Sequence, residues 1–328
     1  MKFLIIGLGS MGKRRIRNLE ALGYSDIIGF DIKSARRKEA EDIYGIDTVS
    51  SLNNIAYFDA VIISAPPDKH NEYIRLSIER QKSCFVELSL VIQDLPELNE
   101  LAKTNKVVVA PSCTFRFHPA IKFIKQVVKD GKYGKVTNFS YHSGQFLPDW
   151  HPWESIEDFF VSKKETSGCK ELLSFELHWM IDILGKPEEI FGYSGKTFGF
   201  NIDTDDTYAV GLKYNNFMGI LLIDVVSRFA TRSFILNLEK AQIRWSWENR
   251  EVKLYDAGDR RWTSFFEPSG QGEFGYNENI VEDMYIEELK AFIDAINGVE
   301  DFPVTLAEDI EILKIVENCE KYMHSQRV

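Results

Sequence analysis

A glycine-rich turn near the N-terminus constrains the fold of this chain more than any other feature. The apolar segment Lys2–Ile6 is followed directly by Gly7-Leu8-Gly9-Ser10-Met11-Gly12, where a helical pattern begins. In such a turn the first glycine permits a tight bend, the second admits a pyrophosphate, and the third allows close helix–strand packing. The next predicted strand ends at Asp31, 19 positions after Gly12, where a carboxylate binds ribose hydroxyls. The pattern predicts a dinucleotide site that includes Gly7, Leu8, Gly9, Ser10, Met11, Gly12 and Asp31.

The residues after the second strand bear on the choice of cofactor. Asp31 favours NAD, because a carboxylate there repels the 2′-phosphate of NADP. Arg36 and Arg37 lie just beyond; they could bind that phosphate, or they could form a solvated helix face. We expect NAD, with NADP as the alternative.

The first third of the chain alternates short apolar runs with helical patterns, which is typical of a doubly wound parallel sheet buried on both faces. The predicted strands are Lys2–Ile6, Ile27–Asp31, Ala60–Ser64, Cys84–Glu87 and Val107–Ala110. The predicted helices are Gly12–Leu22, Ala35–Tyr44, Lys69–Arg80, Leu95–Thr104 and Ala120–Asp130.

From Val136 onward, predicted strands follow one another without intervening helices, which favours a second α+β domain with a large, mostly antiparallel, open-faced sheet. These strands are Val136–His142, Asp205–Tyr214, Met218–Val226, Arg232–Leu238, Ala241–Trp247 and Glu251–Tyr255, and the helices are Glu171–Leu184, Val281–Ile296 and Leu306–His324. We predict a Rossmann domain over residues 1–119 and a substrate-binding and oligomerisation domain over residues 120–328.

Composition excludes several classes of protein. The net charge of −11 argues against nucleic acid as a partner, because such binding depends on neutralising phosphates. The four cysteines are far apart in the sequence, which predicts neither a disulfide framework nor a metal site. No apolar run reaches the length of about 18 residues that a membrane span needs. We expect a soluble cytoplasmic protein with no membrane partner.

Several motifs resemble the glucose-fructose oxidoreductase, inositol dehydrogenase and MocA-like oxidoreductases. Besides the glycine turn they are Ser64-Ala65-Pro66-Pro67-Asp68-Lys69-His70, Arg116-Phe117-His118-Pro119-Ala120, the segment Asp130–Val136, and Leu147-Pro148-Asp149-Trp150. The resemblance implies a Rossmann domain, a C-terminal α/β domain whose open sheet face often mediates oligomers, and a sugar or cyclitol substrate. It also implies that the cofactor site includes Ser64, Ala65, Pro66, His70, Glu87 and Arg116, to which the position of Arg36 just beyond Asp31 adds that arginine.

The chain departs from the family pattern at two places. The family's Glu-Lys-Pro motif is Glu87-Leu88-Ser89 here, so the lysine that acts on the reacting hydroxyl in the family is missing. The family's helix motif, an Asp followed four residues later by His, also lacks a full counterpart. Alignment on His178 places Ser174 at the Asp position, whereas alignment on Gly185-Lys186-Pro187 places Phe175 near the histidine position and makes Glu171 the carboxylate.

Helical periodicity gives a second argument for the same segment. Glu171, Ser174, His178 and Asp182 fall on one helix face, and Ser174 and Asp182 are each one turn from His178. An imidazole oriented by a carboxylate is a workable acid–base group, although a buried histidine satisfied by its neighbours fits the pattern equally well. The catalytic candidates are therefore His178 and Glu171. Arg116 could bind the substrate or the nicotinamide end of the cofactor, or could pair with an acidic neighbour. His142, His151 and Asp149 could line the substrate pocket or lie in a surface loop, and Tyr141 and Glu176 are further candidates with no role assigned.

These features predict hydride transfer between nicotinamide and a hydroxyl or carbonyl of a sugar, cyclitol or nucleotide-linked sugar. The alternative is a non-catalytic sensor or partner protein that binds the nucleotide but has lost the family's lysine. Because the strand Gly219–Ile223 is apolar on both faces, we also expect a homodimer or homotetramer.

Overall fold

The computed structural model describes residues 1–152, 154–268 and 282–325, and the chain divides into two compact units. The N-terminal unit consists of Met1–Thr114 and Asp283–Leu313, and the C-terminal unit of Phe115–Glu282 and Lys314–Val328. The boundary predicted at residue 119 does not anticipate that the segment Asp283–Leu313 groups with the first unit.

The N-terminal unit contains a six-stranded sheet in the order β3-β2-β1-β4-β5-β6, and all its strand pairs are parallel. The strands are β1 (Phe3–Ile6), β2 (Ile27–Phe30), β3 (Asp47–Val49), β4 (Ala60–Ile63), β5 (Ser83–Val86) and β6 (Val109–Pro111). The helices of this unit are α1 (Ser10–Ala21), α2 (Ser34–Tyr44), α3 (His70–Glu79), α4 (Leu95–Asn105) and α7 (Glu282–Ile296), joined by the first part of α8 (Leu306–Ser325). The predicted doubly wound parallel fold is confirmed.

The burial of β1 and β4 explains why this sheet is the centre of the unit. Every residue of both strands is buried, as expected for parallel strands covered on two faces. Leu306, Ile310 and Leu313 of α8 belong to the same core cluster as Leu4 and Ile63. The C-terminal part of the sequence therefore completes the N-terminal core.

The C-terminal unit contains an eight-stranded sheet in the order β14-β13-β12-β11-β7-β10-β9-β8. Its strand pairs are antiparallel except for β7 and β10, which run parallel. The strands are β7 (Val136–Phe146), β8 (Glu189–Gly195), β9 (Thr207–Lys213), β10 (Met218–Asp224), β11 (Val226–Leu238), β12 (Ala241–Ser246), β13 (Glu251–Asp256) and β14 (Arg261–Phe266). The predicted mostly antiparallel sheet is confirmed.

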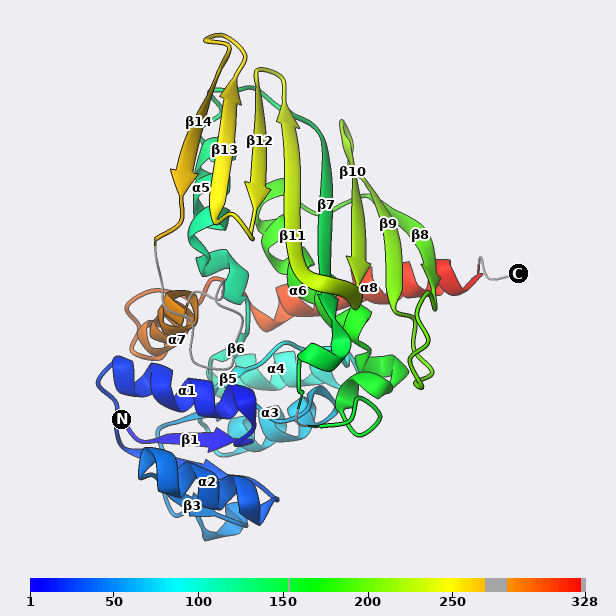
Figure 1. Ribbon diagram of the computed structural model, residues 1–328. Helices are drawn as coiled ribbons and strands as arrows, with labels where there is room; N and C mark the ends of the chain where they lie inside the picture. Colours follow the sequence, from blue (N-terminus) through cyan, green and yellow to red (C-terminus); the bar gives the residue numbers. More distant parts are fainter. Residues whose placement is uncertain (153, 269–281, 326–328) are drawn as a thin grey trace. The chain divides into compact units, whose positions relative to one another are not determined.

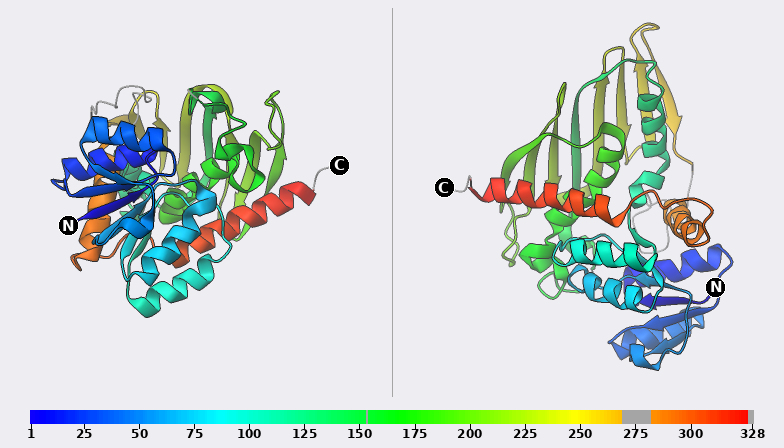
Figure 2. Two further views of the ribbon diagram at one scale, coloured as in Figure 1. Left: turned by 90° about the horizontal axis from the view of Figure 1, so that it is seen from below. Right: turned by 180° about the vertical axis from the view of Figure 1, so that it is seen from behind.

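Helices α5 (Pro119–Lys129) and α6 (Gly168–Leu184) cover one face of this sheet, as the views from opposite sides show (Figures 1 and 2). Tyr141, Phe234 and Trp245 point to this covered face and pack around Trp179 of α6. Residues that alternate with them, such as Ile220 and Tyr193, are exposed. None of the described helices combines the length and apolar character that crossing a membrane requires.

Three strands were not expected from the sequence, and each has a weak pattern. β3 is three residues long and has no buried residue, and β14 is almost wholly exposed. β8 is the edge strand next to β9 and is mostly exposed or half-buried. Edge strands need little apolar alternation because their pairing partner positions them, so hydrophobic periodicity does not indicate them.

Candidate cofactor and active site

The glycine turn is shaped by close backbone contacts that only glycine tolerates. Gly7 has φ +93°, and a Cβ there would lie 2.5 Å from the Ser64 carbonyl oxygen. A Cβ at Gly12 would lie 1.8 Å from the Gly7 carbonyl oxygen, so α1 meets the turn at van der Waals distance. At Gly9 the nearest atom is the Arg36 guanidinium, 3.6 Å away. The turn is therefore packed at its two ends and open in its middle, which fits a pyrophosphate lying against Gly9.

The first turn of α1, which includes Ser10 and Met11, supplies partial positive charge for the negatively charged pyrophosphate. Its N-cap is Gly9, which has no capping side chain, and no acidic residue lies in the first turn. Backbone N–H groups at such a terminus, together with the helix dipole, attract an anion. The residues of this segment thus fit the pyrophosphate of a dinucleotide.

Asp31 fixes the turn from the next strand. Its side chain is 5% exposed, Oδ2 accepts a hydrogen bond from the Leu8 N–H at 2.9 Å and Oδ1 accepts one from the Lys33 N–H at 2.8 Å. Each carboxylate oxygen has a further lone pair, so ribose hydroxyls can still be accepted. The side chain of Leu8 is buried in the core, so any contact of Leu8 with a cofactor would involve its backbone.

The two arginines that follow β2 differ in position. The Arg36 guanidinium lies 3.8 Å from the Asp31 carboxylate and next to the open middle of the turn. Arg37 instead donates to the Asp31 carbonyl oxygen at 2.7 Å. Arg36 is thus the arginine placed to meet a 2′-phosphate, and it also partly neutralises the carboxylate that would repel one.

The segment after β4 forms the next wall of the turn. Ser64 contributes its carbonyl oxygen beside Gly7, and the Nε2 of His70 lies 2.8 Å from the Ala65 carbonyl oxygen. Burial lowers the pKa of His70, so its ring is neutral and Nε2–H donates this bond. His70 therefore braces the turn at Ala65, while Pro66 is exposed.

Glu87, at the end of β5, takes part in a buried ion-pair network that the sequence did not reveal. Its carboxylate binds the fully buried Arg15 through contacts of 2.6 and 3.2 Å. The Ser64 hydroxyl lies 3.5 Å from the same carboxylate. Arg15 also binds Glu288 of α7. A buried arginine needs a carboxylate to pair with. The run Lys13-Arg14-Arg15 in the predicted first helix therefore indicated that a cation could be buried there, but the sequence did not indicate which carboxylates pair with it.

The catalytic candidates lie on α6 in the C-terminal unit. Ser167 caps this helix by accepting a hydrogen bond from the Lys170 N–H. His178 is 2% exposed and Glu171 is half-buried. The two lie on the face of α6 turned away from Glu176, because successive residues advance by about 100°.

The surroundings of His178 differ in part from the prediction. Asp182 was a candidate to orient the imidazole, but its carboxylate pairs with Arg116 at 3.5 Å and with Lys125 at 2.7 Å. Arg116 also donates from Nε to the His178 carbonyl oxygen at 3.1 Å. Of the roles considered for Arg116, the structure shows the ion pair with an acidic neighbour, and a contact with the cofactor stays a prediction.

The opposite face of α6 holds Glu176 inside a saturated network. The carboxylate accepts hydrogen bonds from Tyr141, Ser143, Trp179 and Arg232, at distances from 2.6 to 3.0 Å. Burial and this carboxylate raise the pKa of the Tyr141 phenol. These hydrogen bonds hold α6 on the sheet. Because the Glu176 carboxylate is already bound by four donors, we assign this network a structural role.

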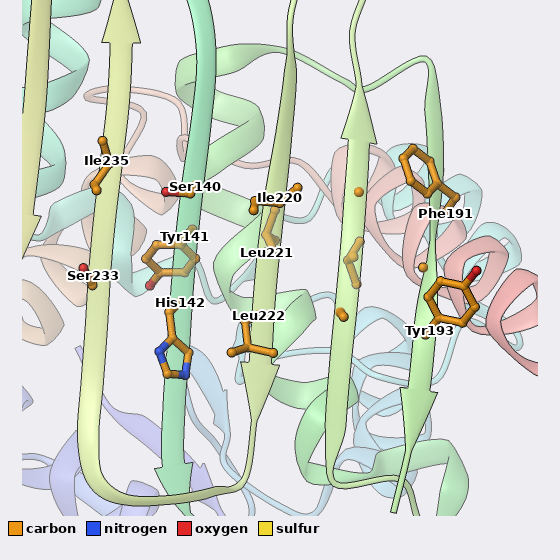
Figure 3. Close-up of a pocket in the computed structure, with 14 residues that line it drawn as sticks. Ser140, Tyr141, His142, Phe191, Tyr193, Ile220, Leu221, Leu222, Ser233 and Ile235 are labelled. Carbon is orange, nitrogen blue, oxygen red and sulfur yellow. The ribbon is translucent and has the colours of Figure 1, made fainter. Parts of the chain in front are cut away.

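Three further candidates, His142, His151 and Asp149, lie outside α6. His142 lies on the uncovered face of the sheet, where its Nε2 is 2.7 Å from Asp224, so the sheet separates it from α6. It lines an apolar hollow of about 480 Å³ (Figure 3). His151 lies 3.5 Å from Glu154, and Asp149 is exposed in a 3-10 turn (Leu147–Asp149).

Comparison with known proteins places both units in one family. Residues 1–112 match the model of an oxidoreductase family with an NAD-binding Rossmann fold, and residues 121–244 match the GFO/IDH/MocA C-terminal domain. Among curated proteins, the uncharacterized oxidoreductase YrbE of Bacillus subtilis is 28% identical over 137 residues, which are 40% of each chain. The myo-inositol 2-dehydrogenase of Thermotoga maritima is 25% identical over 142 residues, 41% of this chain and 42% of that protein.

Solved structures show the same fold over the whole chain. An oxidoreductase from Agrobacterium radiobacter, in complex with NAD+, L-tartaric acid and magnesium, has a TM-score of 0.86 at 13% identity and covers 100% of this chain and 97% of that one. Levoglucosan dehydrogenase, in complex with NADH and levoglucosan, has a TM-score of 0.85 at 15% identity, with 100% and 98% covered. The glycine turn, the acidic residue after β2 and the two matched domains lead to one conclusion: the chain belongs to the GFO/IDH/MocA family of NAD-binding oxidoreductases.

Proposed function

We propose that this protein is an NAD-dependent dehydrogenase that acts on a hydroxyl or carbonyl group of a sugar, cyclitol or nucleotide-linked sugar. The observation that carries the proposal is the glycine turn, which is closed at Gly7 and Gly12, open at Gly9 and tied to Asp31. Relatives named for myo-inositol and levoglucosan support a polyhydroxylated substrate.

Bound NAD would supply hydride acceptance, and the protein would bind it, orient the substrate and move one proton. Leu88 stands where the family has its lysine and has no titratable group. We therefore assign proton transfer to His178 and substrate positioning to Glu171, with the reverse assignment as the alternative. The segment from Ser64 to Pro66, together with Glu87, would face the cofactor.

A second function is favoured by the same leucine. A nucleotide-binding sensor or partner protein needs the glycine turn and Asp31 but does not need a lysine at position 88. The two functions differ in turnover and not in binding.

Purified protein incubated with NAD and a panel of sugars and cyclitols, followed at 340 nm, tests the proposal. Turnover of at least one compound supports a dehydrogenase. Measurable NAD binding with no turnover across the panel would favour the sensor.

We also propose that two copies associate through the uncovered face of the eight-stranded sheet. Tyr193, Met218 and Ile220 on this face are 70%, 62% and 64% exposed. Tyr193 and Ile220 also line the hollow that His142 lines (Figure 3). Contiguous apolar surface of this kind is typical of protein interfaces.

A further inference from the structure

The guanidinium of Arg36 lies beside the middle of the glycine turn. Arg36 belongs to the first turn of α2, which follows β2 and Asp31. Its Nη1 lies 3.6 Å and its Cζ 3.8 Å from the position that a Cβ would take at Gly9. The second glycine of such a turn lacks a Cβ so that a pyrophosphate can approach the backbone. Arg36 is therefore on the side of Gly9 where the pyrophosphate of a dinucleotide would lie.

In the part of the chain that the structure describes, no hydrogen bond holds the Arg36 guanidinium. Its ion pair with Asp31 is 3.8 Å long, which exceeds hydrogen-bond distance, and both Asp31 oxygens already accept a hydrogen bond from a backbone N–H. A guanidinium has five N–H donors in a planar fork that matches phosphate oxygens. Because the side chain is 33% exposed, it has the freedom to turn these donors toward a ligand.

The neighbouring cations already have partners. Lys13 of α1 pairs with Glu39 at 2.6 Å, and Arg37 donates to two backbone carbonyl oxygens. Arg14 and Arg15 are buried and contact residues of α7. The pyrophosphate of NAD carries two negative charges, whereas a helix N-terminus offers about half a positive charge. The arginine beside Gly9 is thus the side-chain cation best placed to balance the remainder.

We propose that Arg36 binds the pyrophosphate of the cofactor and so contributes to the affinity for NAD and NADP alike. The inference rests on the proposed dehydrogenase function and adds the group that this arginine recognises. The adenosine ribose joins a 5′-phosphate beside Gly9 to a 2′ position beside Asp31, so an arginine between these two residues could meet a phosphate at either end. The 5′ side is favoured, because the first turn of α1 attracts a phosphate and the Asp31 carboxylate repels one. The choice between NAD and NADP then depends on Asp31.

The test compares the dissociation constants of NAD+, NADP+, ADP-ribose and adenosine between the wild-type protein and Arg36→Gln. Calorimetry measures the tighter ligands, and displacement of NAD+ measures the weaker ones. We expect the Kd for NAD+ and ADP-ribose to rise about 10- to 100-fold, the usual effect of losing a hydrogen bond to a charged group. The Kd for NADP+ should rise by the same factor. Adenosine has no phosphate, so its Kd should stay near the wild-type value.

Two further variants separate charge and shape from general effects. Lys38→Gln is the matched control, because Lys38 is an exposed cation of the same helix, and it should leave all four constants unchanged. Arg36→Lys keeps the charge but loses the planar fork, so its Kd for NAD+ should lie between those of the wild-type protein and Arg36→Gln. Thermal unfolding checks that each variant folds.

Three results would overturn the inference. The first is an unchanged Kd for NAD+ in Arg36→Gln, and the second is a loss confined to NADP+, which would place Arg36 at the 2′-phosphate. The third is an equal loss for adenosine, which would place Arg36 at the base or the ribose. If the wild-type protein bound none of these nucleotides, the proposed function itself would fail.

Discussion

Gly9 is the residue at which the turn leaves most room for a ligand. Its neighbours Gly7 and Gly12 could not carry a side chain without displacing backbone, whereas a Cβ at Gly9 would meet only the end of Arg36. Substitution at position 9 therefore tests ligand binding with little effect on the fold, which substitution at position 7 or 12 would not.

Gly9→Asp places a carboxylate where the pyrophosphate is expected. Repulsion between two anions at close range should weaken NAD binding on the order of 100-fold or more, while the melting temperature stays near the wild-type value. Gly9→Ala is the matched control and should bind NAD with a much smaller loss. Calorimetry and thermal unfolding measure both effects, and an unchanged Kd in Gly9→Asp would refute the assignment of this turn.

His118 is a second residue whose behaviour follows from its surroundings. It caps α5 by accepting a hydrogen bond from the Ala120 N–H, stacks on Phe115 and lies 3.6 Å from Glu267. Burial, with Arg232, Arg250 and Lys122 nearby, lowers the pKa of His118 from 6.5 to about 3. Its ring is therefore neutral in the folded protein at any moderate pH.

This lowered pKa predicts acid sensitivity. Below pH 6.5 the unfolded chain binds a proton at His118 that the folded chain does not. The free energy of unfolding therefore falls by about 1.4 kcal/mol for each unit by which the pH is lowered. Burial raises the pKa of Glu267, which acts in the opposite sense. His118→Asn keeps a capping side chain and removes the titration, so its unfolding free energy should fall less steeply between about pH 6.5 and 4. Equal slopes in denaturant titrations would contradict this prediction.

At the scale of elements, helix α6 has one face that is hydrogen-bonded to the sheet and an opposite face that carries the catalytic candidates. The face that carries Glu176 is used up in hydrogen bonds to the sheet. The face that carries Glu171 and His178 also carries Asp182, which pairs with Arg116 and Lys125. Periodicity predicted that Glu171, His178 and Asp182 share one face of a helix, and α6 has them so. Spacing along one helix could not reveal the cations that the segment before α5 and α5 itself contribute.

The assignment of roles on α6 is tested with two variants. His178→Asn should lower turnover by about 10²- to 10⁴-fold, the usual cost of losing an acid–base group, with NAD affinity nearly unchanged. Glu171→Gln should act chiefly on the KM for substrate, because it lies about 10 Å from His178 along the helix axis. Loss of turnover in Glu171→Gln with a harmless His178→Asn would reverse the two roles.

At the scale of the whole molecule, the uncovered sheet face is the surface through which we propose that two copies associate. Helices cover one face of the eight-stranded sheet, and the other exposes an apolar surface around Ile220 and Leu222 (Figures 2 and 3). A second copy would remove this surface from water and so stabilise the pair.

Light scattering at micromolar concentration should give the mass of a dimer or tetramer. Ile220→Asp, at a side chain that is 64% exposed, should shift the mass toward the monomer without unfolding the chain. Val299→Asp is the matched control, because Val299 is 67% exposed in the N-terminal unit, and it should leave the mass unchanged. A monomeric wild-type protein would refute the proposed association.

The sequence by itself determined the architecture and the cofactor class. Glycines at positions 7, 9 and 12 and an acidic residue at position 31 are local requirements of one turn, so their order in the chain is sufficient to predict it. The alternation of buried strands with helices is likewise a local pattern, and the six-stranded parallel sheet followed from it apart from the short β3.

Only the tertiary structure decided which distant groups meet. Glu288 lies 273 positions from Arg15 in the chain and yet binds it at 2.9 Å, and Asp182 pairs with Arg116 and Lys125 rather than serving the histidine on its own helix alone. His142 and His178 are separated by a sheet, although both were candidates for one pocket. The physical reason is that buried charges must find partners wherever folding brings them, and no periodicity within a segment encodes that choice.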